Sequence, residues 1–180
     1  MTQKPPSYVR NAIRTPDGTI IYSRSVHDYR THVDANGEEY MVDGGLEYLR
    51  RSVVKDAPHE ELAVESTQPF EIIREALEWG TYGKDGKDSL RYIRLCDMSD
   101  EHIAKVIEML RGAVAAIQRR RREMASSMEL PHQFREAVGL SSKRKDPEPE
   151  PEPIDPWMVG FLVKEQEYRK EHGIVVNDTA

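Results

Sequence analysis

Four polar side chains between residues 28 and 43 have the types and spacing from which a binding or catalytic site could be built. Asn36-Gly37 predicts a hairpin turn, because both residues tolerate positive φ. A two-residue turn places four polar side chains on one strand face, with an arginine directly opposite an aspartate: Asp28, Arg30, His32 and Asp43. The carboxylates and the imidazole could ligate a metal ion or work as an acid–base pair, and the guanidinium could hold a phosphate or a carboxylate.

The same four residues also suit a solvated strand face with ordinary charge pairs, and we favour this interpretation. The stretch contains no HExxH or HxH motif, and His27 falls on the opposite face. That opposite face would pack on the core through Tyr29, Thr31, Val33, Tyr40 and Val42. A one-residue shift of the turn would exchange the two faces. The Gly44-Gly45 pair could admit a ligand to the backbone or simply turn the chain.

A glycine-rich stretch, GTYGKDGK at residues 80–87, invites comparison with phosphate-binding loops. It lacks the G-x-x-x-x-G-K-[ST] spacing and follows a predicted helix rather than a buried strand, so we interpret it as a hairpin loop around Asp85-Gly86. Its return strand is predicted over 90–95. Tyr82 in this loop and His102 in the first turn of the next helix complete the set of candidate ligand-binding side chains.

The elements that would position these residues alternate between strand and helix patterns. Thr15–Gly18 is a turn that starts a strand-biased run over 19–33. Helical spacing predicts a short helix over 46–53 and another from about 68 to Trp79, with Thr67 as N-cap and Gly80 as stop. A long helix follows the capping residues Asp97 and Ser99, with an apolar stripe of Ile103, Val106, Ile107, Leu110, Val114 and Ile117. A shorter helix is predicted over 131–138.

The composition changes at Ser141, where KRKDPEPEPEP predicts an extended polyproline II spacer. Asp155-Pro156 then starts an amphipathic helix that ends near Gly173. Its large apolar side chains could dock in the groove of another protein, or could pack on this chain's own core or on a partner subunit: Trp157, Met158, Phe161, Leu162 and Tyr168. We therefore predict an α+β core over 1–140, a linker over 141–154 and a tethered helix over 155–180.

The composition excludes several classes of protein. The formal net charge is −6 over 180 residues, which disfavours non-specific binding to nucleic acid. The exposed cluster Arg119–Arg122 points all round a helix, and we favour its pairing with the acidic spacer over binding to phosphates. A single cysteine, Cys96, excludes an internal disulfide and clustered thiolate zinc sites. No apolar run is long enough to cross a bilayer and no signal-peptide core is present, so we expect a cytoplasmic protein without a cofactor.

Two segments of the chain have distinctive sequences: RTPDGTIIYSRSVHDYRTHVDANGEEYMVDGGLEYLRRS, residues 14–52, and IREALEWGTYGKDGKDSLRYIRLCDMSDEHI, residues 73–103. Both resemble segments of small uncharacterised accessory proteins that tailed bacteriophages encode. The long helix that follows resembles them less distinctively, and the resemblance stops before the proline-rich tail. It implies an infected bacterial cytoplasm as the setting, host takeover or defence evasion as the role, and a host or phage protein as the partner of the C-terminal helix.

Three functions follow as hypotheses. The first is a non-catalytic interaction protein that uses the C-terminal helix. The second is a protein that sequesters a nucleotide-like ligand, or a metal-dependent enzyme, at the outer face of the first hairpin. The third, nucleic-acid binding through the arginine cluster, is disfavoured by the net charge.

Overall fold

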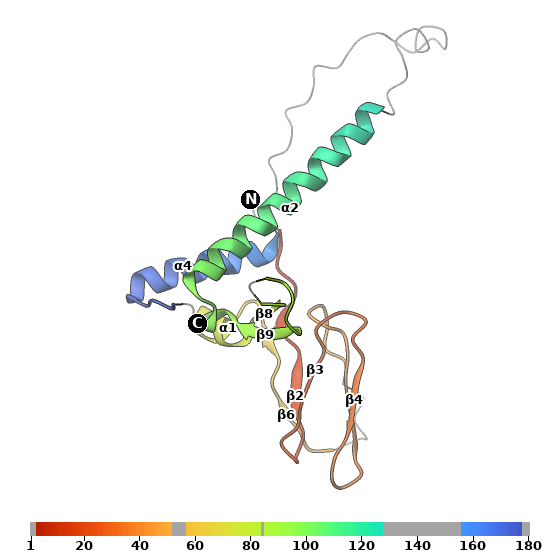
Figure 1. The fold of residues 1–180 in the computed structure, drawn as a ribbon. Helices are drawn as coiled ribbons and strands as arrows, with labels where there is room; N and C mark the ends of the chain where they lie inside the picture. Colours follow the sequence, from red (N-terminus) through yellow and green to blue (C-terminus); the bar gives the residue numbers. More distant parts are fainter. Residues whose placement is uncertain (1–2, 52–56, 84, 128–155, 178–180) are drawn as a thin grey trace, which may run out of the picture.

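The computed structural model describes residues 3–51, 57–83, 85–127 and 156–177. Small antiparallel sheets and helices, including one long helix and a C-terminal helix, give the predicted α+β fold. Figure 1 shows two parts, which we call the strand lobe and the helical lobe. The strands that run between the lobes are β1 (Tyr8–Arg10) continuing into β2 (Ala12–Arg14), and β6 (Glu60–Glu61) continuing into β7 (Val64–Glu65).

The strand lobe consists of two hairpins that pack on each other. Strand β2 pairs with β3 (Ile20–Tyr22) on one side and with β6 on the other. Strand β4 (Arg30–Val33) pairs with β5 (Glu39–Val42). Four buried side chains make the small core of this lobe: Ile13, Ile21, Tyr40 and Val42. Because this core is small, the turns of the strand lobe are held mainly by backbone and side-chain hydrogen bonds.

The register of the β4–β5 hairpin differs by one residue from the prediction. Val33 pairs with Glu39, not with Tyr40. The turn contains three residues, because Gly37 takes a φ of +83° and Asp34 pairs with Glu38 across it. The predicted apolar face is therefore confirmed for Tyr40 and Val42, which are buried, and wrong for the residues of the other strand, since Tyr29 is 58% and Val33 60% exposed. The predicted Arg30–Asp43 pair is also wrong, since Arg30 now lies opposite Val42.

The β2–β3 tip is built in the same way, and it confirms the predicted turn at Thr15–Gly18. The amide of Gly18 donates to the carbonyl of Thr15, and the amide of Thr15 donates to the carbonyl of Thr19. The strand-biased run over 19–33 is interrupted, however. The amide of Asp28 donates to the carbonyl of Ser25, and this turn separates β3 from β4.

The helix predicted over 46–53 is absent from the described part of that range, because a turn closes there. Buried Asn11 donates from Nδ2 to the carbonyl oxygens of Asp43, Gly45 and Tyr48 at 2.8–3.2 Å. The amide of Gly45 donates to the buried hydroxyl of Ser23 at 2.9 Å. These hydrogen bonds to Asn11 and Ser23 take the place of helical ones. The glycine pair therefore turns the chain and has a structural role.

The helical lobe carries the larger core. It contains α1 (Phe70–Ala76), β8 (Glu78–Thr81), β9 (Arg91–Arg94), a 3-10 turn at Leu95–Asp97, α2 (Asp100–Ser127) and α4 (Trp157–His172). Buried side chains from all three helices meet in one cluster, including Ile73, Leu95, Met98, Ile103, Val159 and Leu162. The second hairpin, β8–β9, is confirmed.

Helix α1 is shorter than predicted at both ends. It begins at Phe70 with Pro69, rather than Thr67, at the N-cap position, and its last residue is Ala76. Leu77 is extended, and Trp79 pairs with Ile93 in the hairpin. Gly80 is therefore a strand residue rather than a helix stop. Pairing with β9 overrides the helical periodicity of residues 77–79.

Helix α4 packs on the helical lobe of its own chain. Val159 and Leu162 are buried beside Ile103 of α2. Gly173 ends α4 with a φ of +65°, as predicted. The predicted cap of α2 is also confirmed, because the amide of His102 donates to the Ser99 hydroxyl. The 131–138 helix, the 141–154 spacer and the pairing of that spacer with arginine lie outside the described residues.

A buried ionic network fixes α4. Glu165 is 0% exposed and receives two hydrogen bonds from Arg74, at 2.6 and 2.8 Å. Arg169 donates to Glu165 at 2.7 Å, to the Asp100 carboxylate at 2.7 Å and to the Met98 carbonyl at 2.8 Å. A buried charge is tolerated only when its partners are in place, so this network specifies one docked position.

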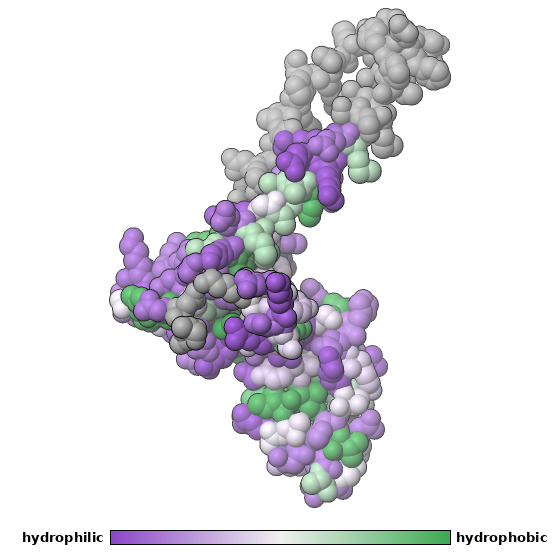
Figure 2. Space-filling view, in the orientation of Figure 1, coloured by the Kyte–Doolittle hydropathy of each residue, from purple (hydrophilic) through white to green (hydrophobic). Residues whose placement is uncertain are grey.

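Beyond its contact with α4, helix α2 extends away from the body of the molecule (Figure 1). The arginine cluster Arg119–Arg122 lies exposed on this part, where Figure 2 shows hydrophilic residues. Its four side chains lie on successive positions of one helix, as predicted.

Candidate functional site

The outer side chains of the first hairpin do not converge on one point. Arg30 donates from Nε to the Asp28 carboxylate at 2.5 Å. His32 instead reaches the neighbouring hairpin tip, where its Nε2 lies 2.9 Å from the Asp17 carboxylate. Each group is taken by a different partner, so the predicted shared site is not assembled.

Asp43 lies apart from the other three candidates. It is buried, and its carboxylate lies 3.5 Å from the guanidinium of Arg50, with which its backbone forms a bridge. Its carbonyl accepts a hydrogen bond from Asn11. This position makes Asp43 a structural residue of the glycine turn.

Because of the contact between the two hairpin tips, we expect the free energy of unfolding to fall at acid pH. The hydroxyl of Thr15, the ring of His32 and the amide of Thr19 all bond the Asp17 carboxylate and hold its pKa well below its usual range. A depressed pKa gives stability that is complete above the unfolded pKa, about 4, and is lost as the pH falls through the folded pKa. The advantage of the wild type over Asp17→Asn should therefore be constant above about pH 5 and shrink below it, in urea unfolding.

Thr15→Val provides the matched variant for this prediction, because it removes the largest cause of the shift. The loss of stability on acidification should then be smaller than in the wild type and should be complete at a higher pH, because the folded pKa of Asp17 rises toward the unfolded one. An advantage that stays unchanged down to about pH 2 would contradict the assignment.

A larger hollow lies elsewhere, between the β8–β9 hairpin and the first turns of α2. We call this space, of about 790 Å³, the hairpin–helix groove. The hairpin and its loop contribute Trp79, Gly80, Thr81, Tyr82, Gly83, Gly86, Asp88 and Arg91. Helix α2 contributes Glu101, His102, Lys105, Val106 and Met109.

Local periodicity explains why these side chains share one space. In the hairpin, Trp79 pairs with Ile93 and Thr81 pairs with Arg91, so strand alternation places these side chains on one face. On α2, His102, Val106 and Met109 recur at spacings of three and four, which is one helix face. The groove is the meeting of these two faces.

Apolar side chains form most of the groove surface. Val106 is buried, Trp79 is half-buried, and Tyr82 and Met109 are each 54% exposed. Tyr82 and His102, which are far apart in the sequence, line the same groove. The structure thus brings two of the six candidate ligand-binding residues together in this groove, while Asp28 and Arg30 pair with each other at the first hairpin. The alternation of the second hairpin could have added Trp79 from the sequence alone.

The glycine loop is a tight hairpin connection, as predicted, rather than a phosphate cradle. The amide of Gly83 donates to the Thr81 hydroxyl, and the amide of Gly86 donates to the carbonyl of Gly83. The amide of Asp88 donates to the carbonyl of Tyr82 at 2.8 Å. These described amides are used within the loop, so they are not directed at a ligand.

The rim of the groove carries charges of both signs. Arg91 and Lys105 contribute positive charge, whereas Asp88 and Glu101 contribute negative charge. Lys105 and Glu101 also pair with each other along α2. The formal charges of these four rim residues cancel.

The five candidate partner-binding residues occupy different environments. Leu162 and Phe161 are buried in the core of the helical lobe. Tyr168 packs edge-on against Phe70, with ring centroids 5.7 Å apart. Trp157 and Met158 are half-buried at the beginning of α4, where they line a second cavity. The structure favours the alternative in which this helix packs on its own core.

Among the described residues, no group of three or more His, Cys, Asp or Glu side chains is arranged to hold a metal ion. No helix in the described ranges is long and apolar enough to span a membrane. Comparisons with protein-family models, curated proteins and solved structures find no match. Function is therefore argued from the groove itself.

Proposed function

We propose that this chain is a non-catalytic binding protein that captures a small organic ligand in the hairpin–helix groove. The observation that carries the proposal is the groove itself, with Trp79, Tyr82, Val106 and Met109 on its surface. Its volume of about 790 Å³ lies within the range of roughly 300–1,000 Å³ that is typical of small-molecule sites. Apolar surface with a few polar groups at the rim is the usual composition of such sites.

The groove chemistry narrows the class of ligand. Tyr82 and Trp79 can stack on a planar ring, and Met109 adapts to ligands of different shape. Because the four rim charges cancel, a ligand with little net charge fits better than a polyphosphate. A nucleoside-like molecule meets both conditions, and this keeps the nucleotide-like hypothesis while moving it away from the first hairpin.

The docked position of α4 supports ligand binding in the groove over the hypothesis that this helix binds another protein. To present Phe161 and Leu162 to another protein, the helix would have to leave its core. That step would expose the Glu165 carboxylate and break its bonds to Arg74. It would also expose the apolar core that Phe161 and Leu162 form with Val159, and exposing buried apolar surface to water is unfavourable.

The setting is also a proposal. The resemblance of residues 14–52 and 73–103 to phage-encoded accessory proteins supports a role in an infected bacterial cytoplasm. Sequestering a host signal molecule needs binding groups but no catalytic residues. The groove would suffice for that task.

Native mass spectrometry of the protein as purified from cells, compared with its denatured mass, tests the proposal. We expect excess mass that Met109→Arg abolishes, because this change fills the groove at an exposed position. Ala104→Arg is the matched control, since Ala104 is exposed on the same helix and does not line the groove.

A fluorescence titration supplies the second readout. The chain has two tryptophans, and Trp157→Phe leaves Trp79, which lines the groove, as the only reporter. Adenosine, as a nucleoside probe, should change its emission in the parent and not in the Met109→Arg variant. A bare native mass together with an unchanged Trp79 signal would refute the proposed function.

A further inference from the structure

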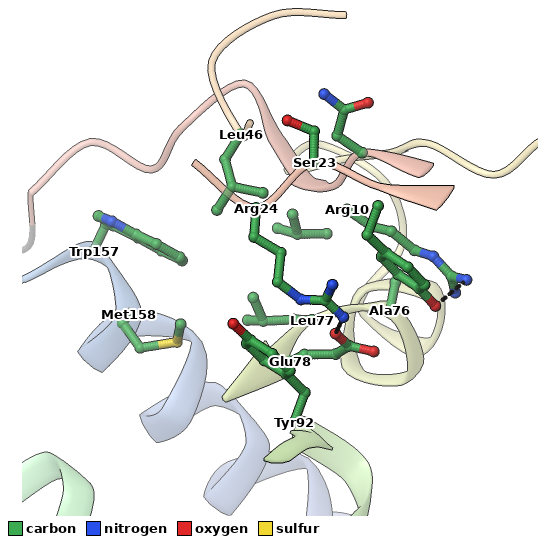
Figure 3. A pocket seen from close by; sticks show the side chains of 13 residues that line it. Arg10, Ser23, Arg24, Leu46, Ala76, Leu77, Glu78, Tyr92, Trp157 and Met158 are labelled. Atoms are coloured by element: carbon green, nitrogen blue, oxygen red, sulfur yellow. Dashed lines mark hydrogen bonds and ion pairs between the residues drawn. The ribbon is translucent and has the colours of Figure 1, made fainter. Parts of the chain in front are cut away.

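A second, smaller cavity lies between the two lobes and takes no part in the proposed groove. We call this cavity of about 140 Å³ the junction cavity. Figure 3 shows how side chains from both lobes and from the beginning of α4 surround it. The junction cavity and the groove lie on opposite faces of the β8–β9 hairpin, because successive side chains of a strand alternate between its faces. Glu78 and Tyr92 face the junction cavity, whereas Trp79 and Arg91 face the groove.

Most of the junction cavity is apolar. Its apolar lining comes from four segments of the chain: Val9, Leu46, Ala76, Leu77, Trp157 and Met158. An apolar cavity of about 150 Å³ is large enough to hold benzene. The space therefore accommodates a group of roughly six to eight non-hydrogen atoms.

The remaining wall is cationic. Arg24 donates to the Glu78 carboxylate at 2.7 Å, and its guanidinium lies 4.2 Å from the ring centre of Tyr22 and 3.9 Å from that of Tyr92. Arg10 donates to the Tyr22 hydroxyl at 2.8 Å. The aromatic rings and the carboxylate hold the two guanidinium groups in place (Figure 3).

The formal charges of the cavity wall do not cancel. Glu78 is the single carboxylate among the lining residues, against the guanidinium groups of Arg10 and Arg24. The Nε atoms of both arginines have no partner among the described residues, but they are fully buried and a ligand in the cavity does not reach them. The Arg24 side chain as a whole is 33% exposed, and only one of its terminal nitrogens bonds Glu78. The wall therefore has one positive charge in excess and an accessible guanidinium group.

We propose that the junction cavity binds a small monocarboxylate with a short apolar chain or ring. Its carboxylate would lie beside the terminal nitrogens of the Arg24 guanidinium, and its apolar part would lie against Leu46, Trp157 and Met158. A carboxylate fits because it supplies the missing negative charge and because it accepts charge-assisted hydrogen bonds from a guanidinium group. A larger anion would not leave room for contact with the apolar wall.

The test uses the full chain with Trp79→Phe, so that Trp157 in the cavity wall is the only tryptophan. Cyclopentanecarboxylate, whose size matches the cavity, is titrated against its uncharged amide, and binding is followed by Trp157 emission and by calorimetry. We expect the carboxylate to bind at least about tenfold more tightly than the amide. Because the groove is read by Trp79 and the cavity by Trp157, failure here leaves the proposed function untouched.

Two variants test the contributions of the apolar wall and the cationic wall separately. Ala76→Leu should block the carboxylate and the amide alike, since it fills the apolar part without changing the charges. Arg24→Gln should abolish the preference for the carboxylate. Equal binding of acid and amide, binding that survives Ala76→Leu, or no response of Trp157 to either compound would each overturn the proposal.

Discussion

Replacing Glu165 with alanine is expected to lower the free energy of unfolding by about 3–5 kcal/mol, because two arginines would lose their buried partner. Arg74 would lose both of its bonds to that carboxylate, and Arg169 would keep its charge while 3% exposed. The loss is large against the roughly 5–15 kcal/mol of a typical domain. Urea unfolding followed by circular dichroism would measure it.

Glu167→Ala is the matched control for this prediction. Glu167 lies on the same helix, two residues further on, and is exposed. Its replacement should change stability by less than about 0.5 kcal/mol. If Glu165→Ala does not fold, Glu165→Gln keeps the shape and removes only the charge. A loss below about 1 kcal/mol for both Glu165 variants would show that the network contributes little.

The second large effect is expected at the glycine pair. A Cβ atom on Gly45 would lie 2.3 Å from the carbonyl carbon of Ser25, which is backbone and cannot rotate away. The residue also has a φ of +55°, and its amide bonds the buried Ser23 hydroxyl. Gly45→Ala should therefore cost about 3–5 kcal/mol, through strain and a weakened buried hydrogen bond.

Gly37→Ala separates the two causes of that loss. Gly37 has a φ of +83° in the first hairpin, and a Cβ there would meet no atom within 4 Å. It should cost only the backbone strain, about 1–2 kcal/mol. Thermal unfolding of the two variants in parallel gives the comparison. Equal losses would mean that the close approach to Ser25 contributes nothing.

Features that depend on neighbouring residues could be predicted from the sequence. The Ser99 cap, the Gly173 stop and the turn at Thr15–Gly18 each depend on side chains or glycines within a few positions of the element they end. The second hairpin and the long amphipathic helix α2 were also predictable, since periodicity and turn residues agree there. These elements place Tyr82 and His102 beside the groove.

The register of the first hairpin was not predictable from its Asn-Gly pair alone. Asn36-Gly37 fits a two-residue turn and also a three-residue turn with glycine last. Asp34 decides between them, because its carboxylate accepts the amides of Asn36 and Glu38 across the longer loop. The other hairpin tip has the same loop length, with Thr15 at the position of Asp34 and Gly18 at the position of Gly37. A polar side chain three residues before a glycine thus recurs, and that comparison could have indicated the longer turn.

The burial of certain polar residues could not be predicted from the sequence, for a different reason. Glu165 and Arg169 are four positions apart on a helix, which is the usual pattern of an exposed ion pair. Only contact with Arg74 and with the carbonyl of Met98 makes them interior residues. Asn11 likewise gives no local signal, because its acceptors lie more than thirty positions away. Burial of polar groups depends on long-range contacts that periodicity does not contain.

The separation between Arg74 and Glu165 also has a consequence for the order of folding. These two residues are 91 positions apart, so their contact closes one of the longest loops in the chain. Loop closure of that length is entropically costly, whereas α1, the β8–β9 hairpin and the first half of α2 are near neighbours. We expect these neighbours to assemble first and α4 to dock last. Glu165 variants should then speed unfolding and leave the folding rate nearly unchanged.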